Sequence, residues 1–302
     1  MGVEIVYCRC LPGRGGADVE GRRSSFSTLP LRSELRHVLQ TPIIRFQSLC
    51  TVVGQGETDL LAVLFDWTCR ERQMEIRVDS LIEGASRAQG TAIIVDVFRA
   101  FTTAAIAFTG GADKIILVAE VDEALDLKRR GLGELCMGEV GGIRPEGFDL
   151  GNSPFEVAGA DVRGKTVIQS TRAGTVGVAA AGRARRIYVC SLVIARATSQ
   201  AVLRDGPDLV TIVAMGLEGR ARTDEDEQCA LYLRNLLQGR APDHDAVRAL
   251  VLAGEDSLKF DDPAHPQNHP SDRQIALQID SIPLAIEVRR EDGLLVARAE
   301  AV

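Results

Sequence analysis

Beyond Met74 the chain alternates between continuous apolar runs and segments with the composition of helices. Thr91–Val97 (TAIIVDV) is apolar almost throughout, as in a strand buried on both faces, and Ala100–Phe108 follows with helical composition. The expected strands and helices then continue through Lys114–Val118, Val121–Arg130, Leu135–Met137, Thr166–Ser170, Gly174–Ala181, Arg186–Cys190, Leu192–Leu203, Leu209–Ala214 and Glu225–Leu237. Repeated strand–helix units predict an α/β fold with a mainly parallel sheet covered by helices. We expect its functional site at the carboxyl ends of the strands.

Two further patterns refine this topology. The apolar runs 284–288 and 294–297 flank Glu291-Asp292-Gly293, which predicts a C-terminal hairpin. Residues 93–125 also resemble residues 166–197 with one gap, since each copy has an apolar strand, an Arg-Ala pair, a Thr three residues after the Arg, and an Ala-rich helix. Small residues match easily by chance, so internal duplication and coincidence are equally good explanations.

Residues 1–73 lack this regularity. Residues 11–28 combine Gly, Arg and Ser without an apolar period, and the short apolar runs that follow do not alternate clearly with turns. We therefore expect a poorly ordered N-terminal extension over residues 1–73 and an α/β domain over residues 74–302. The extension is either an appended segment or sequence upstream of a true start at Met74, and the missing period favours the second interpretation.

Composition and charge exclude several classes of protein. With 45% apolar and 25% charged residues the chain is not largely disordered, and its 4% of aromatic residues require a core of Ala, Val, Leu and Ile. The net charge of −7 argues against a nucleic-acid partner. Because no apolar run approaches the ~20 residues that span a bilayer and no signal peptide is evident, we expect a cytoplasmic protein with no membrane partner. Its seven scattered Cys are expected to be reduced thiols.

The first motif with recognisable chemistry is Asp96-Val-Phe-Arg-Ala-Phe-Thr-Thr103, at the end of an expected strand. The Asp96 carboxylate suits a hard cation. Arg99 and the hydroxyls of Thr102 and Thr103 suit a phosphate or sulfonate at a helix start. The alternative is a structural Asp–Arg pair with a threonine cap, and the motif alone does not separate the two. Phe98 stands where haloacid-dehalogenase phosphatases need a second Asp, so an aspartyl-phosphate of that type is not supported.

The segment Gly138–Pro154 is a long loop without a periodic pattern, and such loops inside a compact domain are more often functional than idle. Glu139 is a second candidate ligand for a cation. Asn152 and Ser153 offer polar groups to a substrate. The alternative is an ordered surface loop whose polar side chains only cap turns.

Two later segments carry related chemistry. STRAGT (170–175) repeats the arginine-plus-threonine pattern in Arg172 and Thr175, and Gly174 permits close approach of the backbone to a ligand. Glu225 and Asp226 belong to a run of acids at the start of an expected helix, where the helix dipole alone also stabilises them. Carboxylates from separate strand ends are the ligands that a Mg²⁺ site needs, and the expected set is Asp96, Glu139, Glu225 and Asp226.

Two other spacings carry little weight. Cys190 and Arg196 have the Cys-x5-Arg spacing of tyrosine phosphatases, but no glycine lies between them to expose N–H groups to phosphate. His265 and His269 have a spacing that metal ligands use, but proline in this segment prevents a helical pair and favours a polar loop.

The combination of motifs, in this order, gives the chain a specific resemblance. Residues 74–302 resemble the 2-phosphosulfolactate phosphatase family through VDVFRAFTT (95–103), GE (138–139), GFDLGNSP (147–154), STRAGT (170–175) and EDEQCA (225–230). The resemblance implies a three-layer α/β/α fold and Mg²⁺-dependent hydrolysis of a phosphate ester on a sulfonated lactate, a reaction associated with coenzyme M biosynthesis. Val140, Ile194 and Leu231 depart from the family's pattern, where an Arg, an Asn and a Gly are usual. The sequence therefore defines the reaction class better than the substrate.

The motifs and the resemblance together predict a set of roles. The expected catalytic residues are Asp96, Arg99, Glu139, Arg172 and Asp226. The expected substrate-binding residues are Thr102, Thr103, Asn152, Ser153, Gly174 and Thr175. No nucleophile is evident, so we expect metal-activated water with one carboxylate as general base, acting on a small anionic phosphate ester. The alternative is a non-catalytic binder of small phosphorylated or sulfonated anions on the same fold, and the oligomeric state is open, with a homodimer among the options.

Overall fold

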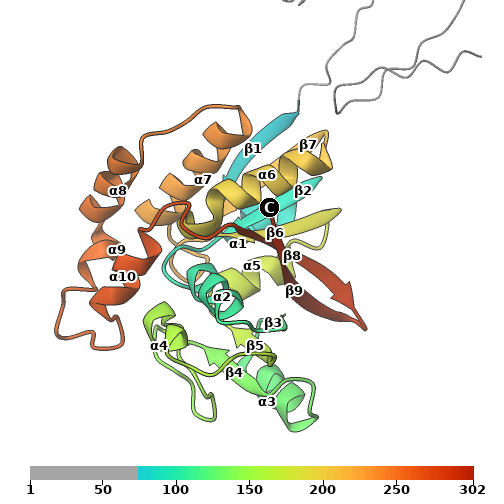
Figure 1. Cartoon of the computed structure of the whole chain (residues 1–302), viewed down its shortest axis with the longest axis vertical. Helices are drawn as coiled ribbons and strands as arrows, with labels where there is room; N and C mark the ends of the chain where they lie inside the picture. The colour runs from blue at the N-terminus through green and yellow to red at the C-terminus, as the bar shows by residue number, and fades with distance from the viewer. Residues whose placement is uncertain (1–73) are drawn as a thin grey trace, which may run out of the picture. The chain divides into compact units, whose positions relative to one another are not determined.

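A nine-stranded sheet organises residues 74–302, which are the residues that the computed structural model describes (Figure 1). The strand order is β1-β7-β2-β6-β8-β9-β3-β5-β4. One group of parallel strands comprises β1 (Glu75–Ser80), β7 (Leu209–Ala214), β2 (Thr91–Val95) and β6 (Arg186–Cys190), and a second comprises β3 (Lys114–Val118), β5 (Thr166–Ser170) and β4 (Leu135–Gly138). The prediction made for residues 1–73 lies outside the described residues.

The predicted C-terminal hairpin is confirmed and joins the two groups. Its strands are β8 (Leu284–Glu291) and β9 (Leu294–Ala301). β8 pairs antiparallel with β6, and β9 pairs antiparallel with β3. The sequence predicts the turn, but the position of the hairpin in the middle of the sheet depends on partners that are distant in the chain.

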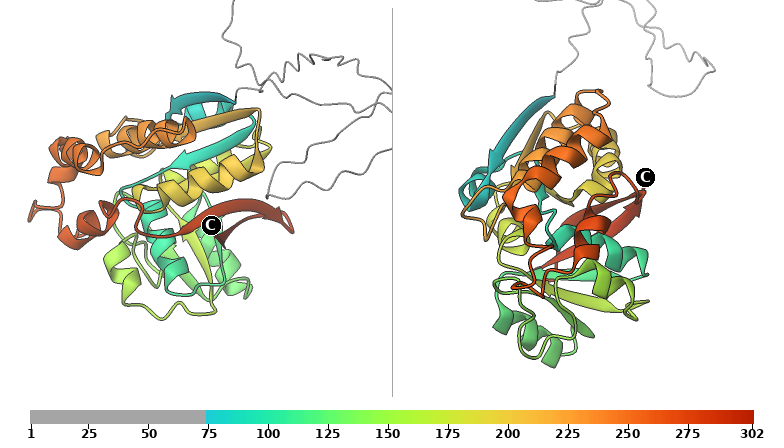
Figure 2. Two further views of the ribbon diagram at one scale, coloured as in Figure 1. Left: turned by 45° about the horizontal axis from the view of Figure 1, so that its top comes forward. Right: turned by 90° about the vertical axis from the view of Figure 1, so that its left-hand side faces the viewer.

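Helices cover the sheet on both faces, which confirms the three-layer α/β/α architecture (Figure 2). α6 packs against α7, and α1 packs against α5. The helices of the described part are α1 (Leu81–Arg87), α2 (Ala100–Thr109), α3 (Val121–Arg129), α4 (Pro154–Ala158), α5 (Gly174–Ala180), α6 (Ala195–Asp205), α7 (Asp224–Leu237), α8 (His244–Ala253), α9 (Glu255–Leu258) and α10 (Pro270–Ala276), with a 3-10 turn at Leu192–Ile194. Within this part, no helix is long and apolar enough to span a membrane.

The two similar sequence segments can be compared through their strand pairing. In the first group β2 pairs with β6 so that Thr91 lies opposite Arg186, and in the second β5 pairs with β3 so that Thr166 lies opposite Lys114. The hairpin then adds one antiparallel strand to β6 and one to β3. The two similar sequence segments thus hold corresponding places in the strand order, but their registers differ by two residues from the sequence match, so duplication stays a prediction.

Small residues bring the two groups together at the carboxyl ends of β2 and β5. A Cβ atom on Gly174, at the start of α5, would lie 2.9 Å from the Cβ of Ala100, at the start of α2. The Gln169 side chain of β5 also donates a hydrogen bond to the Ala100 carbonyl (2.9 Å). Loops from both groups therefore meet in one place, as a shared site requires.

Candidate active site

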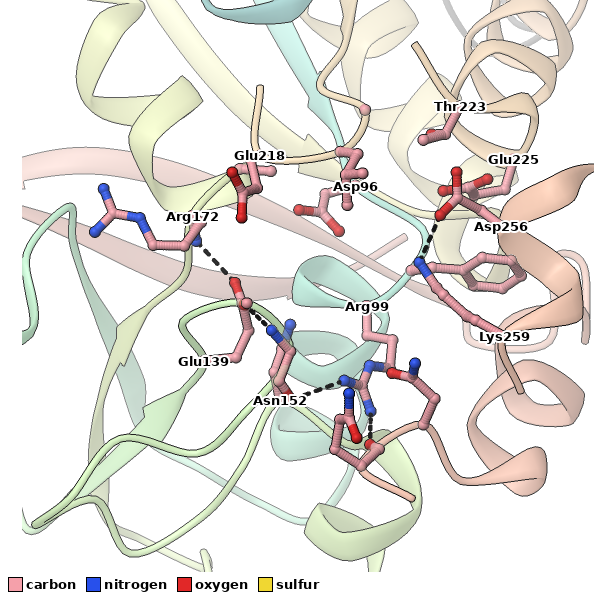
Figure 3. A pocket seen from close by; sticks show the side chains of 18 of the residues that line it. Asp96, Arg99, Glu139, Asn152, Arg172, Glu218, Thr223, Glu225, Asp256 and Lys259 are labelled. Atoms are coloured by element: carbon pink, nitrogen blue, oxygen red, sulfur yellow. Dashed lines mark hydrogen bonds and ion pairs between the residues drawn. The ribbon is translucent and has the colours of Figure 1, made fainter. Parts of the chain in front are cut away.

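A cavity of about 250 Å³ lies where the loops after β2, β4, β5 and β7 converge (Figure 3). The segment that runs from α9 to the start of α10 forms a further wall. The predicted site residues that line the cavity are Asp96, Arg99, Glu139, Asn152, Arg172 and Glu225. The predicted residues outside this lining are Thr102, Thr103, Ser153, Gly174, Thr175 and Asp226.

Asp96 directly follows β2 and is 5% exposed. Its Oδ1 accepts a hydrogen bond from the Ala100 N–H (2.9 Å) in the first turn of α2. Burial raises the pKa of Asp96 to about 6, and the nearby negative charge of Glu139 adds to this rise, while the N–H groups of Ala100 and Gly174 oppose it. A carboxyl group poised near neutral pH therefore faces the cavity.

Glu225, in the first turn of α7, is a second buried acid in the same cavity. Burial raises its pKa to about 7. The negative charge of Asp256 adds to the rise, whereas the positive charge of Lys259 opposes it. Buried acids with raised pKa values in a cleft are typical of functional sites, because folding alone does not favour them.

Asp226 supports the cavity without lining it. Its Oδ1 accepts a hydrogen bond from the Val97 N–H and its Oδ2 from the Gly216 N–H, both at 2.7 Å. One carboxylate thus ties the loop after β2 to the loop after β7. Burial, and then the charges of Glu225 and Asp96, raise the pKa of Asp226 well above its usual range.

Glu139 bridges the loops of the second strand group in the same way. Its Oε2 accepts from the Gly142 N–H (2.7 Å), and its Oε1 accepts from the Arg172 N–H (2.8 Å). The Arg172 guanidinium turns away from Asp96 (Figure 3) and lies 3.4 Å from Glu120. Arg172 therefore contributes its backbone to the site more directly than its charge.

Arg99 forms a buried ion pair, but its partner is Asp272, not the Asp96 that the motif suggests. Arg99 Nη1 donates to Asp272 Oδ2 and to the Gln267 carbonyl, both at 2.8 Å. Asp272 is 0% exposed, and its Oδ1 accepts from the Ser153 hydroxyl (2.6 Å) and the Phe155 N–H (3.0 Å). Sequence reasoning missed Asp272, because its segment predicts only a polar loop.

The remaining predicted residues shape the loops around the cavity. Thr102 Oγ1 donates to the Val97 carbonyl (2.8 Å), and Thr175 Oγ1 donates to the Thr171 carbonyl (2.9 Å). A Cβ atom on Gly174 would lie 2.9 Å from Asp96 Oδ2, so glycine lets α5 begin beside that carboxylate. The substrate-binding role expected for these residues stays a prediction.

Three more polar groups lie in the loops and helices around the cavity. The Thr103 hydroxyl and the Asn152 Oδ1 are buried without a hydrogen-bond partner among the described residues, and Asn152 faces the cavity. Lys259 also lines the cavity. A single lysine directly after a short helix belongs to no motif, so no sequence pattern points to it.

The carboxylates of the cavity suit a hard cation that needs only one or two protein ligands. Within residues 74–302 no group of three or more His, Cys, Asp and Glu side chains is arranged as a metal site. Glu139 and Asp226, two of the predicted ligands, use both carboxylate oxygens for backbone N–H groups. Asp96 and Glu225 face the cavity, and Mg²⁺ commonly binds one or two protein carboxylates together with water and substrate phosphate. These two residues fit Mg²⁺.

Comparison with known proteins agrees with the motifs. The family model described as 2-phosphosulpholactate phosphatase matches residues 77–267. A protein of Carboxydothermus hydrogenoformans named "Probable 2-phosphosulfolactate phosphatase" is 42% identical over 165 residues, which are 54% of this chain and 68% of that protein. Proteins of the same name from Bacillus subtilis and Deinococcus radiodurans are 38% and 37% identical over 149 and 153 residues. These alignments cover 49% and 50% of this chain and span just under two thirds of the relatives' length, 64% and 63%. The chain belongs to the 2-phosphosulfolactate phosphatase family.

Proposed function

We propose that this chain hydrolyses the phosphate monoester of a small hydroxy acid, with 2-phosphosulfolactate as the first candidate substrate. The observation that carries the proposal is that two buried carboxyl groups of raised pKa, Asp96 and Glu225, share one cavity with the Arg99 guanidinium. The names of the relatives support the same reaction. In this reaction a water oxygen bonds to phosphorus and the phosphorus–ester oxygen bond breaks. The ester oxygen leaves as the hydroxyl of the acid, gaining one proton for the one that the attacking water loses.

Mg²⁺ is the proposed cofactor, with Asp96 as its protein ligand. When bound, the cation neutralises negative charge on the phosphoryl oxygens. Glu225, whose pKa is about 7, is the proposed general base that takes the proton from the attacking water, because a base is most effective when its pKa lies near the working pH. Arg99 and Asn152 orient the acid part of the substrate from the side of the cavity opposite Glu225 (Figure 3).

For Glu139 and Asp226 we propose a positioning role in place of direct metal binding. Each holds two backbone N–H groups from loops that carry other site residues. The three departures from the family's pattern do not favour loss of activity. Among the described residues that line the cavity, none is Val140, Ile194 or Leu231.

The test measures phosphate release by the full chain. The substrates are 2-phosphosulfolactate and the matching phosphorylated lactate without the sulfonate, each with Mg²⁺ and with a chelator. We expect turnover that requires Mg²⁺, and a fall of about 100-fold or more for Glu225→Gln. Asp161→Asn is the control, because Asp161 pairs with Lys165 outside the cavity.

Calorimetry beside the phosphate-release assay tests the alternative function. Tight binding of these anions by calorimetry without phosphate release would show a non-catalytic binder. The expected cytoplasmic location and the link to coenzyme M biosynthesis stay predictions.

A further inference from the structure

Lys259 is a cation of the cavity that no motif assigns. It lies at the C-terminal end of α9, with its side chain 25% exposed. Its Nζ lies 2.8 Å from Asp256 Oδ1, and Figure 3 shows it pointing toward the carboxylates of Asp256 and Glu225. An ammonium group has three donors, and Asp256 accepts one of them, so Lys259 retains donors for a ligand.

The segment that carries Lys259 is fastened to the loop after β2 at two points. The rings of Phe260 and Phe98 pack edge to face with centroids 4.9 Å apart. Arg99, the next residue after Phe98, donates to the Gln267 carbonyl and pairs with Asp272. Lys259 is therefore held in a fixed relation to Asp96, which lies two residues before Phe98.

The two arginines that line the cavity already have protein partners for part of their donor groups. Arg99 Nη1 is engaged by Asp272 and Gln267, and the Arg172 guanidinium lies near Glu120 outside the centre of the cavity. The acidic groups that line the cavity together with Lys259 are Asp96, Glu139, Glu218, Glu225 and Asp256. A phosphate dianion that approaches these carboxylates needs a positive group with free N–H donors beside it.

We propose that Lys259 is a catalytic residue that donates a hydrogen bond from Nζ to an oxygen of the phosphate group being removed. The inference rests on the proposed function and assigns the phosphate end of the substrate to the wall formed by α9. Arg99 and Asn152 are then left for the acid's own anionic groups. Lys259 strengthens this contact as negative charge spreads over the phosphoryl oxygens in the transition state.

The first experiment measures the affinity of the full chain for inorganic phosphate with Mg²⁺ by calorimetry, without any turnover. We expect Lys259→Met to weaken binding at least tenfold and Lys259→Arg, which keeps the charge, to weaken it less. Lys165→Met is the matched control, because Lys165 is 32% exposed and pairs with Asp161 at 2.9 Å, but lies outside the cavity. Circular dichroism confirms that each variant is folded. Unchanged phosphate affinity in folded Lys259→Met would overturn the proposal.

A second measurement locates the contact on the substrate. If Lys259 binds phosphate, Lys259→Met lowers kcat/KM equally for the phosphorylated acids with and without the sulfonate. A loss confined to the sulfonated substrate would assign Lys259 to the second anion and refute the proposal. If the parent releases no phosphate from any acid, the proposed function fails, whereas the calorimetric comparison still decides the role of Lys259.

Discussion

Removal of the Asp272 carboxylate is the sharpest test of how this site is held together. Asp272 is 0% exposed and accepts hydrogen bonds from Arg99, Ser153 and Phe155. Asp272→Ala leaves the Arg99 guanidinium, itself 5% exposed, without its counter-charge. Removing one partner of a buried ion pair costs about 3–5 kcal/mol, a large share of the ~5–15 kcal/mol that stabilises a typical domain.

The assay is urea denaturation followed by circular dichroism, which gives the free energy of unfolding. Asp261→Ala is the control, because Asp261 pairs with Arg273 in the same part of the chain but is itself 57% exposed. Water screens the exposed carboxylate, so we expect a loss of no more than about 1 kcal/mol. Asp272→Asn keeps the size of the side chain and one acceptor oxygen, and we expect a loss between those of the other two variants.

A double variant distinguishes the ion pair from packing. Arg99→Met with Asp272→Leu replaces both charges with apolar groups, and buried pairs replaced in this way often lose little stability. We therefore expect the double variant to be more stable than Asp272→Ala. If Asp272→Ala lies within about 1 kcal/mol of the parent, the pair does not hold the loops as argued, because a buried unpaired charge costs more than that.

Two more predictions follow from Asp96 and its neighbours. In metal-free protein the folded-state pKa values of Asp96 and Glu225 are about 6 and 7, above their usual values of 3.8 and 4.5. The native state therefore binds more protons than the unfolded state in this range. The contribution of the two groups to stability falls as the pH rises from about 4 to 7. Asp96→Asn should make unfolding curves less dependent on pH in this window, and an unchanged slope would contradict the burial argument. Gly174→Ala places a Cβ 2.9 Å from both Asp96 Oδ2 and the Ala100 Cβ, so we expect a loss of about 1–3 kcal/mol in urea denaturation and weaker phosphate release. Parent-like stability and turnover would show that the contact of α5 with Asp96 and Ala100 leaves room for a methyl group.

The sequence predicts the parts of the site that follow strands directly. Asp96 and Glu139 come immediately after β2 and β4. Because parallel strands bring their carboxyl ends to one edge of the sheet, the pattern of apolar runs alone places both residues near a site. The partner of Arg99 could not be found in this way. Arg99 and Asp272 are 173 positions apart, and their contact depends on the packing of the whole domain. Local patterns give elements and turns, whereas long-range pairing selects between structural and functional uses of the same side chain.

Asp226 and Arg172 show that membership of a motif does not reveal the role of a residue either. Both lie in motifs of the family, and the motifs alone favour direct roles in catalysis. The hydrogen bonds of Asp226 to Val97 and Gly216 instead give it the geometry of a brace between two loops. Burial of the carboxylate in this role also raises the pKa of Asp226, so a perturbed pKa in this site does not by itself identify a ligand.

The site also depends on chain beyond the segment that defines the family. The family match ends at residue 267, but Asp272 and the hairpin of β8 and β9 follow it. Without the hairpin, β6 and β3 would each lose an antiparallel partner, and exposed sheet edges favour association between chains. Without α10, Arg99 would lose its counter-charge and the loop at Ser153 its acceptor. The motifs therefore supply most of the charged groups that line the cavity, while the C-terminal segment fixes the geometry in which they face one another.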